Sequence, residues 1–459
     1  MRTLLLLSAT TLVLTGTLLS NKPRPTGNHP ISLAAPKPDP NNGGIKLPAG
    51  FGALTVVDSL GARARHIVVD NTGTIFVKQD GGRVRSQNIG IMQLRDTNND
   101  GKADDIKGFG NFPGTGIGIY NGYLYASSDT SVYRYRLTNG MIAEGTQPEP
   151  IVVGLALQRG HSAKSLAISP DGRLFVNFGA PSNACQEKDR APGSKGQDPC
   201  PLLEEYAGIW QFDANKLNQR KADGKRYATG IRNAVALRWN TTNNTLYALQ
   251  HGRDNLFQNW GEMYTAEQSA ELPSEEFLMV KEGADFGWPY CYYDHFQSKK
   301  VLAPEYGGNG TSQGRCEGKE KPIMAFPGHW APNDVLFYTG STGAANGFPA
   351  RYKNGAFICF HGSWNRAPLK QGGYFVAFVP FGNDGRPSGK YEVFAEGFAG
   401  VPEMAAPGQS GPNAGKLDLA GPGDAKHRPM GLAQGPDGSL YITDSVKGTV
   451  YRVMYTAKR

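Results

Sequence analysis

The sequence of 459 residues predicts an all-β fold, a six-bladed β-propeller with long loops between its blades. Three observations predict this fold. The chain has 60 glycines and 31 prolines without a low-complexity run, and no amphipathic helical pattern runs through its middle. A tight turn followed by a short apolar strand occurs six times, at intervals of about 50 to 110 residues that exceed those of a solenoid repeat.

The six copies share a turn rich in Asn, Asp and Gly. Such turns provide the positive φ angles of a tight hairpin, and the alternation along the strand buries one face. The strands lie at residues 75–77, 124–126, 174–176, 246–248, 357–359 and 440–442. Four copies follow a segment with a basic or imidazole residue near its start, namely Arg65, His161, Arg232 and Arg428. The repeat therefore places chemistry at one end of the hairpins, although a β-sandwich with recurrent turns stays open as an alternative.

The N-terminal residues 1–20 have the pattern of a signal peptide, with Arg2 before an apolar run that Ser, Thr and Gly interrupt. A single-span anchor is the alternative, but the run falls short of the roughly 20 apolar residues that a membrane-spanning helix needs. Residues 21–45, rich in proline, are expected to form a flexible leader, and residues 46–459 a single propeller domain. A cleaved signal predicts a periplasmic or secreted protein without a membrane span in its mature form.

The charge pattern argues against a nucleic-acid partner. The net charge is +8, but the lysines and arginines are scattered among acidic residues and form no basic stripe.

Five cysteines fit export to an oxidising compartment. Cys185 and Cys200 bracket one loop rich in glycine, proline and charge, and Cys291 and Cys316 bracket another, so two local disulfides are predicted. A metal cluster is the alternative for these four, although no C-x-x-C spacing occurs. The fifth, Cys359, lies in an apolar strand and is expected to be a buried, unreactive thiol.

A possible structural calcium site begins at Asp96. Oxygen side chains at alternate positions, Asp96, Asn98 and Asp100, precede a glycine and the backbone carbonyl of Lys102, as at the start of an EF-hand loop. The glutamate expected at the twelfth position is replaced by Lys107, so a nearby aspartate would have to substitute. A solvated acidic hairpin loop is the alternative.

Several segments resemble the soluble quinoprotein glucose and sorbosone dehydrogenases. They are Leu166 to Gly179, Gly-Ile-Arg-Asn-Ala-Val-Ala-Leu at 230–237, Gln-His-Gly-Arg-Asp at 250–254, Gly-Ala-Asp-Phe-Gly-Trp-Pro at 283–289, Phe-Tyr-Thr-Gly at 337–340, and Arg428-Pro429 near Asp444. The resemblance runs in order over roughly residues 46 to 455. It implies a six-bladed propeller whose top face holds pyrroloquinoline quinone (PQQ) and calcium and oxidises an aldose or an aldehyde sugar.

The resemblance assigns catalysis to two residues. His161 would be the general base that takes the proton of the sugar hydroxyl while hydride passes to C5 of the quinone, a task that suits an imidazole with a pKa near 6.5. Arg232 would stabilise the negative charge on the C5 oxygen. A histidine bonded to loop backbone and an arginine that caps a loop are the alternative interpretations.

Four residues are candidates for cofactor binding beside Arg232. The resemblance implies that Asn233 donates to a cofactor oxygen, that His361 stands where glucose-oxidising members have lysine, and that Arg428 pairs with a PQQ carboxylate. Asp444, close to Arg428 in the motif, is counted with this set.

The carbonyls of Gly252 and Arg253 match positions that ligate calcium in the family, where the ion would polarise and orient the quinone. The chain departs from the family at three further places. Gly160 stands where an acidic residue precedes the histidine, Val235 replaces a glutamine, and Met430 replaces a second arginine.

Two other functions stay open. A calcium-dependent propeller hydrolase of the lactonase type would use His161 to activate water, and a binding propeller would keep the scaffold without catalysis. The leading interpretation requires a small sugar as substrate and an external electron acceptor, because no haem-attachment C-x-x-C-H motif occurs.

Overall fold

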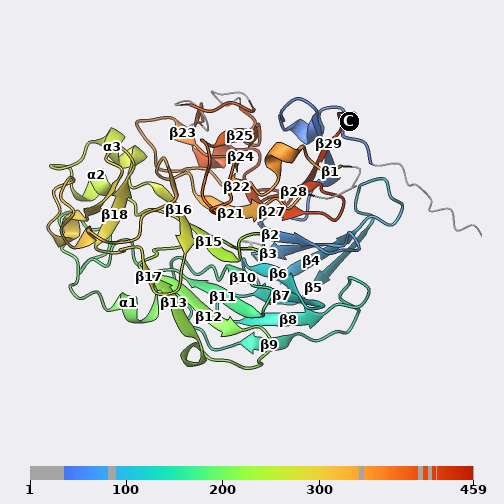
Figure 1. The fold of residues 1–459 in the computed structure, drawn as a ribbon, viewed down its shortest axis with the longest axis horizontal. Coiled ribbons are helices and arrows are strands. Elements are labelled where there is room, and N and C mark those ends of the chain that lie inside the picture. Colours follow the sequence, from blue (N-terminus) through green and yellow to red (C-terminus); the bar gives the residue numbers. More distant parts are fainter. Residues whose placement is uncertain are drawn as a thin grey trace, which may run out of the picture. The chain divides into compact units, whose positions relative to one another are not determined.

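The computed structural model describes residues 36–61, 63–80, 89–340, 346–401, 407–411, 416–419 and 421–457. Six antiparallel sheets make up most of this chain (Figure 1). The first is β2 (Ala64–Val69), β3 (Ile75–Gln79), β4 (Ile91–Arg95) and β5 (Asp105–Phe109). The second is β6 (Ile117–Tyr120), β7 (Tyr123–Ser127), β8 (Val132–Arg136) and β9 (Glu149–Val152).

The third sheet is β10 (Leu166–Ile168), β11 (Arg173–Phe178), β12 (Gly208–Asp213) and β13 (Lys225–Thr229), to which β17 (Ala284–Asp285) adds in parallel. The fourth is β14 (Ala236–Asn240), β15 (Thr245–Gln250), β16 (Glu275–Val280) and β20 (Met324–Phe326). The fifth is β21 (Pro332–Phe337), β22 (Ala356–Phe360), β24 (Phe375–Val379) and β25 (Glu392–Ala395). The sixth is β27 (Pro429–Gln434), β28 (Leu440–Asp444), β29 (Val450–Tyr455) and β1 (Phe51–Val57).

The six sheets are the blades of a closed propeller. Their first strands contact one another in the cyclic order β2, β6, β10, β14, β21, β27 and back to β2. The ring is closed by the chain itself, because β1 pairs with β29 and so completes the sixth blade from the N-terminal side. The predicted six-bladed β-propeller is therefore confirmed.

The predicted repeat coincides with one strand of every blade. The six turn–strand copies are the second strands β3, β7, β11, β15, β22 and β28. Several of the preceding turns have the positive φ that the sequence requires, for example Gly122 at 77° and Gly438 at 84°.

The core is divided into layers between neighbouring blades. Phe175 of the third blade stacks on Trp239 of the fourth with ring centroids 5.4 Å apart, and Tyr247 of the fourth packs against Phe337 of the fifth at 4.7 Å. Buried clusters of the same kind fill every junction of the ring, including the junction between the sixth and first blades. Apolar burial between sheets thus holds the ring together.

Insertions with small cores of their own interrupt the third and fourth blades between their strands. They carry α1 (Leu202–Glu205), α2 (Leu256–Asn259), α3 (Ala266–Glu271) and the hairpin β18 (Cys291–Asp294) with β19 (Lys299–Leu302). A second small pair joins β23 (Gln371–Gly372) to β26 (Lys416–Leu417). Short 3-10 turns occur at Asn42–Gly44, Lys221–Asp223, Pro304–Tyr306, Gly314–Cys316, Ala350–Tyr352 and Pro422–Asp424.

Both predicted disulfides are present in these insertions. Cys185 bonds to Cys200 and Cys291 bonds to Cys316. Cys359 is a free thiol buried in β22, and burial raises its pKa well above the usual value. This thiol is therefore unreactive and packs in the core, as expected.

The predicted signal peptide 1–20 lies outside the described residues, as does the predicted leader up to residue 35. The rest of that leader contacts the propeller, because Ile45 is buried among the fifth and sixth blades and the amide of Asp39 donates to the carbonyl of Ala53. None of the helices in the described part of the chain combines the length and apolar character that crossing a membrane requires.

Candidate active site

One end of the blades collects most of the predicted site residues. In each blade the first and second strands are antiparallel, so the start of one lies beside the end of the other, as Pro429 does beside Asp444. We call this end the mouth; it carries Arg65, His161, Arg232, Asn233, His251, His361 and Arg428. The opposite end, where the six repeat turns lie, is called the turn end.

Polar contacts link the blades around the mouth. The side chain of Arg65 donates to Thr115 between the first two blades, at 3.1 Å. His251 bonds to the carbonyl of Pro332 between the fourth and fifth blades, at 3.1 Å. Thr443 donates to the carbonyl of Arg65 at 2.7 Å and closes the ring from the sixth blade to the first.

His161 is held as a neutral imidazole with a fixed tautomer. Its Nδ1 lies 2.5 Å from the carbonyl oxygen of Ala180, and because a carbonyl can only accept, Nδ1 carries the proton. Nε2 then has a free lone pair, and it has no hydrogen-bond partner within the described residues. Burial, and next the charge of Arg232, lower the pKa of His161 to about 3. Such a side chain can accept a proton at neutral pH.

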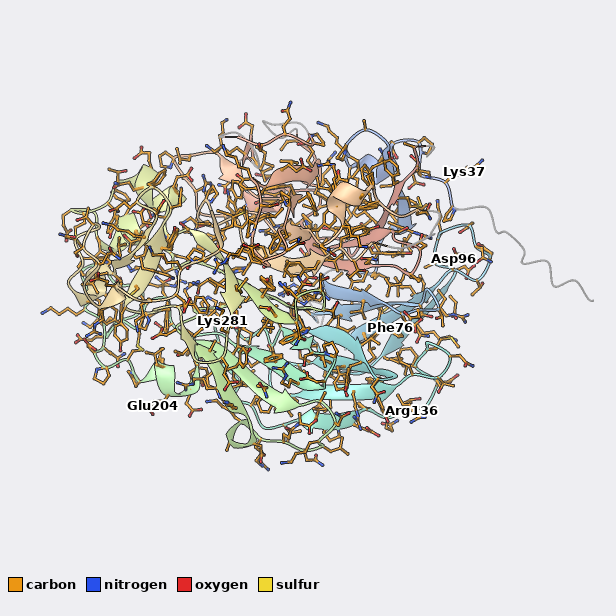
Figure 2. All side chains as sticks on the ribbon, viewed as in Figure 1. Lys37, Phe76, Asp96, Arg136, Glu204 and Lys281 are labelled. Atoms are coloured by element: carbon orange, nitrogen blue, oxygen red, sulfur yellow. A yellow bond between two sulfur atoms is a disulfide. The ribbon has the colours of Figure 1, made fainter. Side chains whose placement is uncertain are left out.

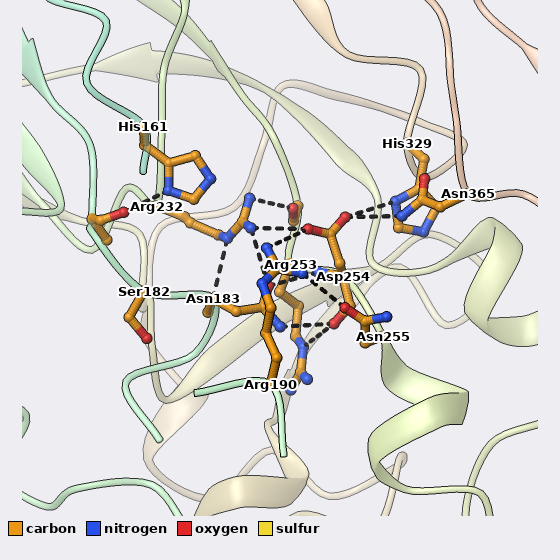
Figure 3. A network of polar contacts seen from close by, with 12 residues as sticks. His161, Ser182, Asn183, Arg190, Arg232, Arg253, Asp254, Asn255, His329 and Asn365 are labelled. Atoms are coloured by element: carbon orange, nitrogen blue, oxygen red, sulfur yellow. Dashed lines mark hydrogen bonds and ion pairs between the residues drawn. The ribbon is translucent and has the colours of Figure 1, made fainter. Parts of the chain in front are cut away.

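Arg232 belongs to a network centred on Asp254 (Figure 3). Its guanidinium donates to the carboxylate of Asp254 at 3.2 Å, to the carbonyl of Gly252 at 2.8 Å and to both oxygens of Asn183. Arg190 also donates to the Asp254 carboxylate, at 2.9 Å. The arginine is thus a fixed positive charge next to His161.

Asp254 receives further donors from the other side. Asn365 donates to its carboxylate at 3.0 Å, and His329 lies 3.5 Å away. Burial opposes ionisation of Asp254, but the contact with His329 and the charge of Arg232 hold its pKa well below the usual value. The negative charge of Asp254 is therefore retained at neutral pH and anchors Arg232.

Asn233 and Asp444 are engaged within the protein. The amide oxygen of Asn233 accepts from Asn177 at 3.2 Å. The carboxylate of Asp444 accepts from the amides of Arg428, Val446 and Lys447 and from Nδ1 of His427. All four lone-pair positions of Asp444 are used, so this residue shapes the backbone that carries Arg428.

His361 and Arg428 lie together at the mouth. Arg428 donates to the carbonyls of His361 and Gly362 at 3.0 and 2.7 Å, and its guanidinium lies 5.3 Å from the centre of the Tyr374 ring. Burial, and next the charge of Arg428, hold the pKa of His361 well below the usual value. His361 is therefore neutral, and it bonds through Nε2 to the hydroxyl of Ser445 at 2.7 Å.

The structure adds Arg65 to the site, although the sequence prediction had not assigned it a role. Its backbone lies against Gly431, the neighbour of Met430, so it stands beside the place where the chain lacks the second arginine. Its charge lowers the pKa of His361. Neither Arg65 nor Arg428 forms an ion pair with a carboxylate among the residues that the structure describes. The signal in the sequence was the basic residue near the start of the first blade.

These residues fit a group such as PQQ. A planar quinone with several carboxylates requires cations that no protein acid neutralises, and Arg65 and Arg428 meet that requirement. Arg428 and Arg65 would hold the carboxylates, while the neutral imidazoles add hydrogen-bonding groups without repulsive charge.

The residues at the predicted calcium site, Gly252 and Arg253, do not fit a bound calcium ion as they stand. The carbonyl of Gly252 already accepts from the guanidinium of Arg232, and a calcium ion there would face a second cation. The side chain of Arg253 points away and pairs with the buried Glu305. In the described part of the chain no three His, Cys, Asp or Glu residues converge as a metal site. Calcium binding at these two carbonyls stays a prediction.

The loop from Asp96 to Lys102 lies at the turn end, between β4 and β5, and not with the other candidates (Figure 2). The carboxylate of Asp96 accepts from the amides of Asp100 and Gly101, and Asn98 also accepts from Asp100. These contacts form a closed loop of side chain–backbone bonds. Calcium binding by this loop stays a prediction.

Comparison with known proteins identifies relatives. The chain is 24% identical over 289 residues to the PQQ-dependent pyranose dehydrogenase of Coprinopsis cinerea, which covers 56% of this chain and 36% of that protein. The structure is similar to the holo PQQ domain of the Coprinopsis cinerea pyranose dehydrogenase, with a TM-score of 0.67, 18% identity and coverage of 89% of this chain and 97% of that one.

It is also similar to the calcium structure of the Trichoderma reesei family AA12 enzyme, with a TM-score of 0.66, 19% identity and coverage of 90% and 97%. The chain spans about half of the length, or less, of the curated relatives it matches. The profile of the TrAA12-like family matches residues 45–456. The resemblance to quinoprotein sugar dehydrogenases is confirmed at the level of family, and the chain belongs to the TrAA12-like family.

Proposed function

We propose that the protein oxidises a pyranose or another aldose with PQQ, and that the reaction takes place at the mouth. One observation carries this proposal: a neutral histidine with a free Nε2 lies beside fixed positive charge, on a face where Arg65 and Arg428 form no ion pair with an acid among the described residues. Such a face suits an anionic cofactor and a proton transfer at the same place. The activity of the Coprinopsis cinerea relative supports the same reaction class.

Arg65 and Arg428 bind the cofactor in this proposal. Charge-assisted bonds from two guanidiniums to carboxylates hold a rigid planar molecule in one orientation. PQQ supplies a two-electron oxidation of the sugar carbon when it is bound. His361, which burial and next the charge of Arg428 keep neutral, contacts the cofactor without adding charge.

His161 is the general base. Nε2 accepts the hydroxyl proton of the sugar, and the Nδ1 proton remains bonded to the carbonyl of Ala180. A pKa of about 3 makes His161 a weak base. The hydroxyl becomes strongly acidic as electrons leave the attached carbon, so a weak base that is always unprotonated at neutral pH suffices.

Arg232 contributes fixed positive charge. It is bound to Asp254, Asn183 and Gly252 before substrate arrives, so it needs no reorganisation when negative charge develops nearby. Asp254 and Asn183 are its positioning residues.

Two substitutions relative to the glucose dehydrogenases, Val235 and Met430, leave no unfilled space at the mouth. Val235 and Met430 are buried, and the sulfur of Met430 lies 3.0 Å from the side-chain nitrogen of Asn333. The hydrolase stays an alternative, and no group of three His, Cys, Asp or Glu residues in the described part of the chain marks a calcium site for it. The two disulfides support export to an oxidising compartment, where an external acceptor would collect the electrons.

The test is a titration of the purified protein with PQQ, followed by absorbance, and then dye reduction with a panel of pyranoses, glucose and sorbosone. Stoichiometric binding and sugar-dependent reduction support the proposal. His161→Ala should bind PQQ but lose at least about a hundredfold in turnover. His295→Ala, which removes a histidine from the β18–β19 hairpin, is the control and should turn over normally.

Titrations with and without calcium belong to the same experiment. A requirement for calcium would mean that Arg232 leaves the carbonyl of Gly252 when the cofactor binds. Absence of PQQ binding at micromolar concentration would reject the proposed function.

A further inference from the structure

We propose that Gln158 is the positioning residue of His161, and that it acts together with Gly179 in place of an acidic neighbour. This inference deepens the proposed function and rests on it, because positioning matters only if His161 takes part in a reaction. The question arises from Gly160, where a carboxylate that could orient the imidazole is absent.

Gln158 holds three carbonyls of the mouth with one amide nitrogen. Nε2 donates to the carbonyls of Gly160 at 2.7 Å, His161 at 3.1 Å and Gly179 at 2.8 Å. The side chain is 8% exposed. Two amide hydrogens shared among three carbonyls tie the turn before the histidine to the end of β11.

The backbone of His161 needs this support. Its φ is +51°, in the left-handed region that a residue with a side chain adopts only when its surroundings require it. Gly179 allows the turn to pack closely, because a Cβ at that position would lie 2.7 Å from both the Cβ and the carbonyl oxygen of His161. Only glycine fits there.

Lys164 holds the same turn from its other side. Its Nζ donates to the carbonyl of Ser162 at 2.7 Å and lies 3.5 Å from Oε1 of Gln158. The side chain is buried and has no carboxylate partner among the described residues. Both polar ends of Gln158 are thus used within the turn.

Ala180 connects this turn to Arg232. Its carbonyl accepts from Nδ1 of His161, and its amide donates to the carbonyl of Arg232 at 2.7 Å. A displacement of the turn would therefore change both the tautomer of His161 and its distance from Arg232. The backbone carbonyl fixes the tautomer, and Gln158 fixes the backbone.

The experiment compares Gln158→Ala and Gln158→Glu with Gln219→Ala. Gln219 is also a buried glutamine, 2% exposed, that donates to three carbonyls, but it lies between β12 and β13 at the turn end. Turnover with PQQ and sugar should fall about a hundredfold in both Gln158 variants and should be unchanged in Gln219→Ala. The fall should be in kcat, while PQQ affinity stays the same.

Two further measurements separate positioning from general damage. The acid limb of the pH profile should move to higher pH in Gln158→Ala, because a loosened His161 is better solvated and lies farther from Arg232 and His251; Asp254 also faces it. Nitrogen NMR of histidine-labelled protein without PQQ, assigned with His161→Ala, should show the Nδ1–H tautomer in the wild type and a tautomer mixture in Gln158→Ala.

A Gln158→Ala protein with wild-type kcat and an unchanged tautomer would overturn the inference. The NMR result does not depend on activity, so a wild type that oxidises no sugar rejects the proposed function without deciding the positioning of His161. If Gln158→Ala does not fold, Gln158→Asn replaces it, with the same expected loss of the long-range bond to Gly179 and the same contradicting result.

Discussion

The mouth and the turn end of the propeller are built from the same strands but differ in chemistry. At the turn end the first strands surround an axial cavity of about 270 Å³, lined mainly by residues such as Ile67, Ile119 and Ile168. Short glycine turns close the blades there. At the mouth, Arg65 lies near the start of the first strand β2, and loops bring His161 and other polar groups together. The difference indicates that the repeat builds the ring, while the irregular segments carry the function.

Strand β14 offers the most direct comparison, since one arginine precedes it and another lies in its middle. Arg232 precedes the strand at the mouth and pairs with Asp254, whereas Arg238 lies in the middle of the strand, lines the axial cavity and pairs with Asp334. Arg232→Ala should lower the free energy of unfolding by about 3 kcal/mol and sugar oxidation by about a hundredfold or more. Arg238→Ala should lower stability while turnover is kept. Urea unfolding and dye reduction measure both, and equal activity losses would break the comparison.

The two disulfides offer a second comparison between a change that affects stability alone and one that also affects turnover. Loss of either should reduce the free energy of unfolding by about 3 kcal/mol, because each closes a loop in the unfolded chain. Only the Cys185–Cys200 disulfide lies close to Asn183, which comes two residues before Cys185 and whose oxygens hold Arg232. Serine replacement of this pair should therefore also lower kcat, whereas replacement of Cys291 and Cys316 should not. The variants can be compared by thermal unfolding and by turnover at saturating PQQ.

The mouth should also respond to acid. Burial lowers the pKa of His161 to about 3 and that of His251 to about 4, so both bind a proton on unfolding between those values and about 6.5. The unfolded state then holds more protons, and stability falls as pH falls through this window. We expect a loss of about 4 kcal/mol from the two histidines together between pH 7 and pH 5, about 2 kcal/mol from each.

Glu275 acts in the opposite direction, because burial raises its pKa to about 7. The contribution of His161 is therefore measured as the difference in the pH dependence of stability between a variant and the wild type. His161→Gln should reduce the dependence of the urea midpoint on pH relative to wild type, and an unchanged dependence would contradict the buried neutral state of His161.

The smallest effect is expected at a repeat turn. Gly122 has a φ of +77°, and a Cβ at that position would meet no other atom within 4 Å. Gly122→Ala should therefore cost about 1 kcal/mol from backbone strain alone. Activity should be unchanged, and thermal unfolding beside a turnover assay checks both. A loss of turnover would mean that the two ends are coupled.

The sequence predicted the fold because its signal is local. Each turn of the repeat fixes a hairpin through neighbouring residues, so all six second strands could be located before any contact was known. His161 and Arg232 were also recognisable, through motifs that lie close to those hairpins. The loop at Asp96 shows the limit, because its spacing indicates possible metal ligands but not their distance from the mouth.

Other features depend on contacts between distant segments and could not be predicted. The bond between Arg232 and the carbonyl of Gly252, the place of Arg65 beside Met430, and the clamp of Gln158 on Gly179 all join different loops or blades. Periodicity and spacing contain no information on such pairings. The carbonyl of Gly252, a predicted calcium ligand, is the clearest example, since only the structure reveals that Arg232 donates to it.

A crystal structure of the protein with PQQ would test the central claim most directly. The account predicts PQQ at the mouth, with its carboxylates on Arg65 and Arg428 and its quinone facing Nε2 of His161 across a space for a sugar. PQQ bound elsewhere, or a mouth without PQQ at concentrations where absorbance shows stoichiometric binding, would contradict it.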